Sequence, residues 1–279
     1  MGSRKKSLVK ESGSSRGSLG HSVNIGVKFE VKTPNGEVYE AHASPTVTVR
    51  AHVANELFAS SPSAILKTIT RIYLADDTGV NRDYADISPS DWYSVTTGTN
   101  YAEATVTKDI PITNDYSVGW FRAYAGSDMY FNAVPPGGGF PVATGQTVTV
   151  TLTLRVSISH SPSVGGGLPS VSVNSTRLAE LILKIFMGQR PSGSYLTLKQ
   201  VRYMAGTANL LTRPLTRSYS TGARSGSASH DFANFASSGN LTDVRVDSEG
   251  YADSIVYTLS TPLSVTTSDR IRYSINISA

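Results

Sequence analysis

The sequence predicts a mainly β protein of two tandem antiparallel β-sandwich (jelly-roll-like) domains, each with one short α-helix and related by internal duplication. Two stretches, QTVTVTLTLRVSIS (146–159) and DRIRYSINIS (269–278), alternate apolar and polar side chains, and each closes one half of the chain. Such alternation is typical of a strand with one face on a core. The composition agrees, because abundant Thr, Ser, Val and Tyr with 24 Gly and 13 Pro suits short strands joined by turns.

Further matched segments in the same order indicate a repeat. PTVTVRAHVANELFA, from Pro45, aligns without a gap with PSVSVNSTRLAELIL, from Pro169, so a strand that runs into a helix is written twice. Next, ILKTITRIYLADDTG (65–79) corresponds to YLTLKQVRYMAGTA (195–208). The two alternating stretches are then expected to be the last strands of the two copies.

The individual elements follow from local patterns. A hairpin is expected over 23–43, with Asn35-Gly36 at its turn. In the first copy, a strand at 45–49 leads into a helix, further strands and an acidic loop (76–91). These elements are expected as a helix at 53–67 and strands at 69–75, 103–109, 117–124, 129–134 and 148–158. In the second copy, after the strand from Pro169, we expect a helix at 175–187, strands at 198–204 and 271–277, and a long polar loop from the first of these strands to about His230.

These elements divide the chain into four regions. They are a flexible basic arm at 1–22, a first domain at 23–160, a Gly/Pro linker at 161–168 and a second domain at 169–279. Eleven of the 22 arm residues are Gly or Ser, a composition typical of a flexible segment.

The charge is divided unevenly along the chain. The arm has a net charge of +4, residues 23–164 contain nine basic and thirteen acidic residues, and residues 165–279 contain eleven and seven. An acidic first copy and a basic second copy favour head-to-tail contacts between subunits, or the attraction of a polyanion. We therefore expect a homo-oligomer or a subunit of a larger assembly.

Several classes of protein are disfavoured. The sequence contains no cysteine, which excludes disulfides and thiolate metal sites. No apolar run approaches 18 residues, and the basic N-terminus does not resemble a secretory signal, so no membrane contact is expected. The five histidines show no metal-ligand spacing, and the local grouping of His230 and Asp231 with nearby serines does not make a triad. The sequence predicts that the protein is not an enzyme.

The acidic loop is a candidate Ca²⁺ site. Its carboxylates are the ligands that hard cations take, although their spacing does not fit an EF-hand. The preferred interpretation is a solvated loop with turn-capping aspartates and no cofactor. The candidate ligands are Asp76, Asp77, Asp83 and Asp86, followed by Asp91.

Aromatic residues suggest a different ligand. Trp92 and Trp120, with neighbouring tyrosines, could line a sugar-binding face. This makes a carbohydrate-binding surface module the first alternative function. Aromatic residues of β domains are more often core or interface anchors.

The basic arm is the remaining candidate contact. It would reach either a neighbouring subunit, which we favour, or nucleic acid, in which case binding would be lost at raised salt. A nucleic-acid-associated protein is therefore the second alternative function. The residues expected at this contact are Arg4, Lys5, Lys6, Leu8, Val9, Lys10 and Arg16.

The chain also resembles known structural proteins. The segments LAELILKIFMG, LKQVRYMAGTA and PLSVTTSDRIRYSINIS, with FPVATGQTVTVTLTLRVSIS in the first copy, resemble a module of virion structural proteins of tailed phages and thermophilic (archaeal) viruses. The first copy departs where Ser60, Ser61 and Pro62 interrupt its helix. The resemblance implies a tail, neck, turret or capsid-surface component, assembled in the host cytoplasm with copies of itself and other virion proteins. It implies no catalytic residues.

Overall fold

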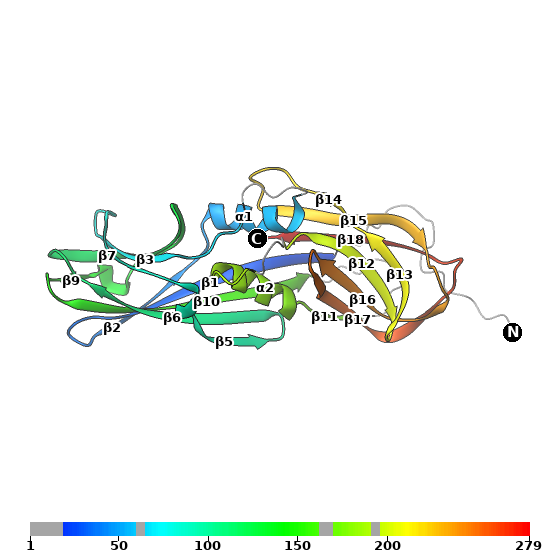
Figure 1. Cartoon of the computed structure of the whole chain (residues 1–279), viewed down its shortest axis with the longest axis horizontal. Coiled ribbons are helices and arrows are strands. Elements are labelled where there is room, and N and C mark those ends of the chain that lie inside the picture. The colour runs from blue at the N-terminus through cyan, green and yellow to red at the C-terminus, as the bar shows by residue number, and fades with distance from the viewer. Residues whose placement is uncertain (1–18, 60–64, 162–169, 191–195) are drawn as a thin grey trace.

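The computed structural model describes residues 19–59, 65–161, 170–190 and 196–279, and the chain is mainly β, as predicted. The two longer helices, one in each half, match the expected number (Figure 1). In chain order the elements are β1 (Leu19–Lys32), β2 (Val38–Ala43), α1 (Val47–Phe58), β3 (Arg71–Asp76), β4 (Asn81–Asp86), η1 (Pro89–Asp91), β5 (Tyr93–Gly98), β6 (Tyr101–Pro111), β7 (Tyr116–Ala125), β8 (Asp128–Ala133), η2 (Pro136–Gly138), β9 (Phe140–Val142), β10 (Thr147–Ser161), β11 (Val171–Asn174), α2 (Thr176–Phe186), β12 (Leu198–Ala205), β13 (Ala208–Pro214), β14 (Thr216–Ser218), β15 (Ser225–Asn234), β16 (Gly239–Ser248), β17 (Tyr251–Val265) and β18 (Arg270–Ser278).

The strands form three sheets. Sheet A has eight strands in the order β14-β15-β18-β1-β10-β6-β5, with β2 beside β1. Sheet B has the order β4-β3-β7-β8, with β9 beside β7, and sheet C has the order β11-β17-β16-β12-β13. We call β1–β10 the first half and β11–β18 the second half. The first half lies at the left of Figure 1 and the second half at the right.

The alternating stretches form strands as predicted. β10 and β18 each direct their apolar side chains into the core, because successive side chains of a strand point to opposite faces. In β10 the buried set is Val148, Val150, Leu152, Leu154, Val156 and Ile158, none more than 3% exposed. In β18 it is Ile271, Tyr273, Ile275 and Ile277.

β1 joins the two halves within sheet A. It pairs antiparallel with β10 from Gly20 to Lys32, and its first residues, Leu19 to Ser22, also pair parallel with the end of β18. This is the one parallel pair among the strands of the described ranges. The last four residues of the predicted arm therefore belong to the sheet, and the predicted domain boundary falls inside a shared layer. The predicted hairpin is confirmed, with Gly36 at a φ of 86° in its turn.

Aromatic contacts show how the layers face one another. Phe29 of β1 and Phe121 of β7 have ring centroids 5.9 Å apart, so sheet B faces one end of sheet A. At the other end, Tyr257 of β17 lies 6.2 Å from Tyr273 of β18, so sheet C faces the second-half strands of sheet A. The core lies between these facing sheets.

Each helix packs on sheet A strands of the opposite half. α1 contacts β15 and β18, and α2 contacts β10 and β6. The fit of α1 is close, because a Cβ on Gly226 would lie 2.4 Å from Cδ2 of Phe58. Only glycine allows that approach. The halves are therefore interlocked by their helices as well as by β1.

The structure corrects the predicted beginning of the first copy. α1 runs from Val47 to Phe58, so it begins inside the segment predicted as a strand and ends before residues 65–67, which were predicted as helix. The alternating residues Pro45, Val47 and Val49 fit either a strand or a helix. In the structure, Val49, Val53 and Leu57 are buried at helical spacing. The gap-free alignment thus places helical Val47 on Val171 of β11, so the two segments differ in structure there.

Two segments predicted as loops contain strands. β4 lies in the predicted acidic loop, and β13, β14 and the start of β15 lie in the predicted polar loop. In β4 only Asp83 is buried, so no apolar alternation marks this edge strand. The predicted linker lies outside the described residues except for Ser161, which ends β10.

Candidate functional site

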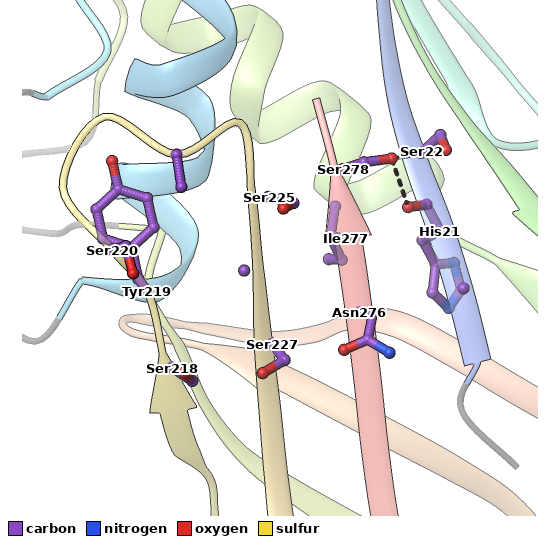
Figure 2. A pocket seen from close by; sticks show the side chains of 13 residues that line it. His21, Ser22, Ser218, Tyr219, Ser220, Ser225, Ser227, Asn276, Ile277 and Ser278 are labelled. Carbon is purple, nitrogen blue, oxygen red and sulfur yellow. Dashed lines mark hydrogen bonds between the residues drawn. The ribbon is translucent and has the colours of Figure 1, made fainter. Parts of the chain in front are cut away.

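A groove of about 510 Å³ opens on the outer face of sheet A in the second half. Its floor is formed by β15, β18 and the beginning of β1, and the segment from β14 to β15 forms one side (Figure 2). Among the described residues that line it, none is Asp, Glu, Lys or Arg. The lining is rich in hydroxyl groups, with Tyr219, Asn276 and the serines Ser22, Ser218, Ser220, Ser225, Ser227 and Ser278.

The register of the strands places these small side chains in rows. Ser225 of β15, Ser278 of β18 and Ser22 of β1 are neighbours across three strands. The Oγ atoms of Ser22 and Ser278 lie 2.9 Å apart. A second row is formed by Ser218, Ser227, Asn276 and Gly20. Because nearly all these side chains are small, the sheet surface is hollow here.

The side of the groove is tied to α1. The Tyr219 hydroxyl donates to the carbonyl oxygen of Ala51 at 3.4 Å and accepts from the backbone N–H of Gly222 at 3.2 Å. The backbone N–H of Ala223 donates to the carbonyl oxygen of Ser220 at 2.9 Å. These bonds hold the segment between β14 and β15 against the helix.

Beneath the groove, His21 belongs to a buried polar network. Its Nδ1 lies 2.5 Å from Nδ1 of His160, and its Nε2 lies 2.9 Å from the hydroxyl of Tyr257. The Tyr257 hydroxyl lies 3.1 Å from that of Tyr273. Burial, and then the neighbouring His160, lower the pKa of His21 to about 4, and burial lowers the pKa of His160. Both rings are therefore neutral at neutral pH.

The network continues to the start of α2. Nε2 of His160 lies 3.3 Å from Oγ of Ser175, which donates to Oδ1 of Asn100 at 3.0 Å. Oδ1 of Asn100 also accepts from the Ser175 backbone N–H at 2.7 Å. Asn100 has a φ of 64°, a conformation that asparagine tolerates in tight turns. The turn between β5 and β6 thus positions the N-terminus of α2 from the other half.

Two more buried histidines face tyrosines. Nδ1 of His52 lies 2.8 Å from the Tyr130 hydroxyl, and Nε2 of His230 lies 2.6 Å from the Tyr203 hydroxyl. Burial is the largest cause that lowers the pKa of each histidine. Sequence reasoning did not find these pairs. For His21, a signal existed, because it shares the inward parity of the following apolar residues of β1.

A buried ion pair connects α1 with the segment after α2. Glu56 is 1% exposed, and its carboxylate accepts bonds from Nη1 and Nη2 of Arg190 at 2.6 and 3.1 Å. The backbone N–H groups of Leu66 and Leu196 also donate to it, at 3.3 and 3.1 Å. Such full satisfaction is what a buried carboxylate requires. Its role is to hold the halves together.

The candidate Ca²⁺ ligands do not converge. Asp76 accepts bonds from Thr78, Val80 and Arg82, as expected for a turn-capping aspartate. The other aspartates bond to separate partners or lie exposed: Asp83 to Thr113, Asp86 to Arg71, Asp91 to Lys108, and Asp77 exposed. Within the described ranges no group of three or more His, Cys, Asp or Glu could hold a metal ion.

The two tryptophans do not form an exposed aromatic surface. Trp92 is 7% exposed and belongs to the core. Trp120 is half-buried in β7, with the Arg122 guanidinium 5.7 Å from its ring. The predicted contact residues of the arm, from Arg4 to Arg16, lie outside the described residues.

None of the helices in the described parts of the chain is long and apolar enough to cross a membrane. Comparisons of the chain with protein-family models, with curated proteins and with solved structures found no match.

Proposed function

We propose that the protein is a non-enzymatic structural subunit that assembles with copies of itself in a virus particle, as a tail, neck, turret or capsid-surface component. The observation that carries this proposal is that two halves of opposite net charge share one sheet. The first half is acidic, the second half is basic, and both contribute strands to sheet A. The virion setting is supported by the sequence resemblance of the helix and closing-strand segments.

Each half exposes side chains that carry the sign of its net charge. The first half exposes Glu37, Glu40, Asp77, Asp109 and Asp115, and the second half exposes Arg213, Arg224, Arg270 and Arg272. Opposite net charges in two parts of one molecule favour a heterologous contact between subunits, which closes into a ring or continues as a filament. A structural role also agrees with the buried histidines, whose ring nitrogens lie within hydrogen-bond distance of buried tyrosine and serine hydroxyls or of each other.

We further infer that each half is a β-sandwich and that the halves derive from one duplicated unit. The strand orders support this inference. In sheets B and C, β4-β3-β7-β8 corresponds to β13-β12-β16-β17, and in sheet A, β5-β6-β10-β1 corresponds to β14-β15-β18-β1. At the start of the first copy, Pro45 forms a β-bridge with β8. At the start of the second copy, β11 pairs with β17, the strand that corresponds to β8. The start of each copy therefore takes a similar place.

Mass photometry and light scattering at low and high salt test the proposed assembly. We expect oligomers at micromolar concentration and low salt, with weaker association at high salt because exposed charges are screened. Reversing Arg270 and Arg272 to Glu should weaken association, whereas the neutral change Ser157→Ala in the first half should not. A strictly monomeric protein at every concentration and salt level would contradict the proposal. Electron microscopy of the oligomers then distinguishes closed rings or shells from irregular aggregates.

A further inference from the structure

The groove offers hydrogen-bonding groups that the protein itself does not use. Within the described parts of the chain, the side chains of Ser218, Ser225, Ser227 and Asn276 have no hydrogen-bond partner, whereas Ser22 and Ser278 bond to each other. These side chains lie on β14, β15, β18 and β1, with the Tyr219 ring at the side (Figure 2). A hydroxyl both donates and accepts, and an amide does the same through two atoms. The groove therefore presents both donors and acceptors.

The charge of the groove restricts its ligand. In the part of the chain that the structure describes, its lining contains no ionised side chain, and His21, which contributes to it, is neutral at neutral pH because burial lowers its pKa to about 4. A charged ligand would lose hydration here without gaining a partner of opposite charge. An apolar ligand would leave the row of hydroxyls without partners. Both considerations favour a neutral, polar ligand.

The size and rigidity of the groove are also informative. Its volume of about 510 Å³ is within the range of roughly 300–1,000 Å³ found for small-molecule sites. The floor is made of paired strands, and Tyr219 is tied to α1, so little ordering is needed on binding. A tyrosine ring beside hydroxyl donors provides an apolar surface next to polar groups.

We propose that this groove binds a neutral saccharide of one or two rings, through hydrogen bonds to its serines and Asn276 and contact with Tyr219. The site is distinct from the tryptophans that the sequence suggested for sugar binding. The proposal does not depend on self-assembly, because either a monomer or an assembled subunit can present this face. Because the groove is shallow, we expect a dissociation constant of about 1 mM, which corresponds to a binding free energy near −4 kcal/mol.

Titration of the ¹⁵N-labelled full chain by NMR tests the proposal. The probes are maltose, lactose and N,N′-diacetylchitobiose, with glucuronic acid as a charged comparison and a neutral tetrapeptide as a polymer comparison. We expect at least one neutral sugar to shift the amide signals of Gly20, Gly226 and Asn276 saturably. No saturable shift up to 50 mM with any neutral sugar would overturn the proposal. Stronger binding of glucuronic acid or of the peptide would overturn the assigned ligand class.

Matched variants locate the site. Ser227→Leu fills the floor of the groove and should reduce affinity at least tenfold. Ser229 lies two residues further along the same face of β15, outside the groove, so Ser229→Leu should leave the affinity for sugar unchanged. Thermal unfolding checks that both variants are folded. Equal affinities in the two variants would overturn this location. Because association is measured separately by mass photometry, a failure of sugar binding is distinguishable from a failure of self-assembly.

Discussion

The closing strands β10 and β18 occupy similar places in the two halves but differ in how much of β1 covers them. β10 pairs with β1 along its length, from Ser161 to Thr149, whereas β18 pairs with it only from Ile275 to Ser278. On that side, the beginning of β18 has no paired strand among the described residues. It exposes Arg270, and charged side chains are a common protection of open strand edges. β1 therefore covers the edge of β10 along nearly its whole length, whereas only the first four residues of β1 cover the edge of β18.

The largest effect is expected from a charge in the enclosed strand. Leu152→Asp places a carboxylate where the side chain is fully buried, and should lower the free energy of unfolding by about 4 kcal/mol or more. Ile271→Asp, at the uncovered end of β18 and 7% exposed, should cost less because its carboxylate can reach water. Urea denaturation measures both variants. Equal losses would show that the coverage by β1 has no energetic consequence.

The next effect concerns the ion pair that joins α1 to the segment after α2. Glu56→Ala leaves two backbone N–H groups and Arg190 without the carboxylate, and should cost about 3–5 kcal/mol. Glu56→Gln retains an acceptor and should cost less. Chemical denaturation followed by tryptophan fluorescence, which reports on the first half, should detect both losses. An unaffected Glu56→Ala variant would contradict a joining role.

Truncation distinguishes the arm from the strand. Deletion of residues 1–18 should barely change the free energy of unfolding, because it removes none of the described pairing. Deletion of residues 1–22 also removes the pairing with β18 and His21, and should cost about 3 kcal/mol. Hydrogen exchange should then increase at residues 275–278 more than in β6. Identical free energies of unfolding of the two truncated chains would show that residues 19–22 do not stabilise the second half.

The smallest expected effect is on pH dependence. Because burial lowers the pKa of His21 from 6.5 to about 4, the unfolded chain binds more protons than the folded chain between these values. The stability from neutral His21 is therefore present above pH 6.5 and is lost as the pH falls toward 4. His21 faces His160 of β10 and Tyr257 of β17, with Tyr273 of β18 behind, and no described Asp or Glu contacts it. We expect a loss of about 1–3 kcal/mol between pH 7 and pH 4.5.

Urea titrations across this pH range measure how steeply the free energy of unfolding of each single variant changes with pH. His21→Gln should reduce this pH dependence, and the exposed His42→Gln serves as the surface control. Hydrogen exchange at acid pH should increase first at residues 19–22 and at the end of β18. A slope that His21→Gln leaves unchanged would mean that other buried groups, such as His52 or His230, dominate the acid sensitivity.

Local periodicity in the sequence was sufficient for several elements. The alternating residues of β10 and β18, the Asn35-Gly36 turn and the apolar face of α2 each lie within one short segment, so neighbouring residues alone indicate the element. The mainly β character and the number of helices follow from these patterns. Capping of a turn by Asp76 was also predictable, because its partners lie within six residues.

Other features depend on contacts between distant segments. Val47 and Val49 fit a strand or a helix equally well, and packing against the rest of the fold decides for the helix. The groove requires serines as far apart as Ser22 and Ser278, which are 256 residues apart in the chain, to meet across strands. The His21–His160 contact depends likewise on the register of β1 and β10. Alternation determines which side chains share a face, but only the tertiary structure determines which strands become neighbours, because pairing and register are set by the packing of the whole core.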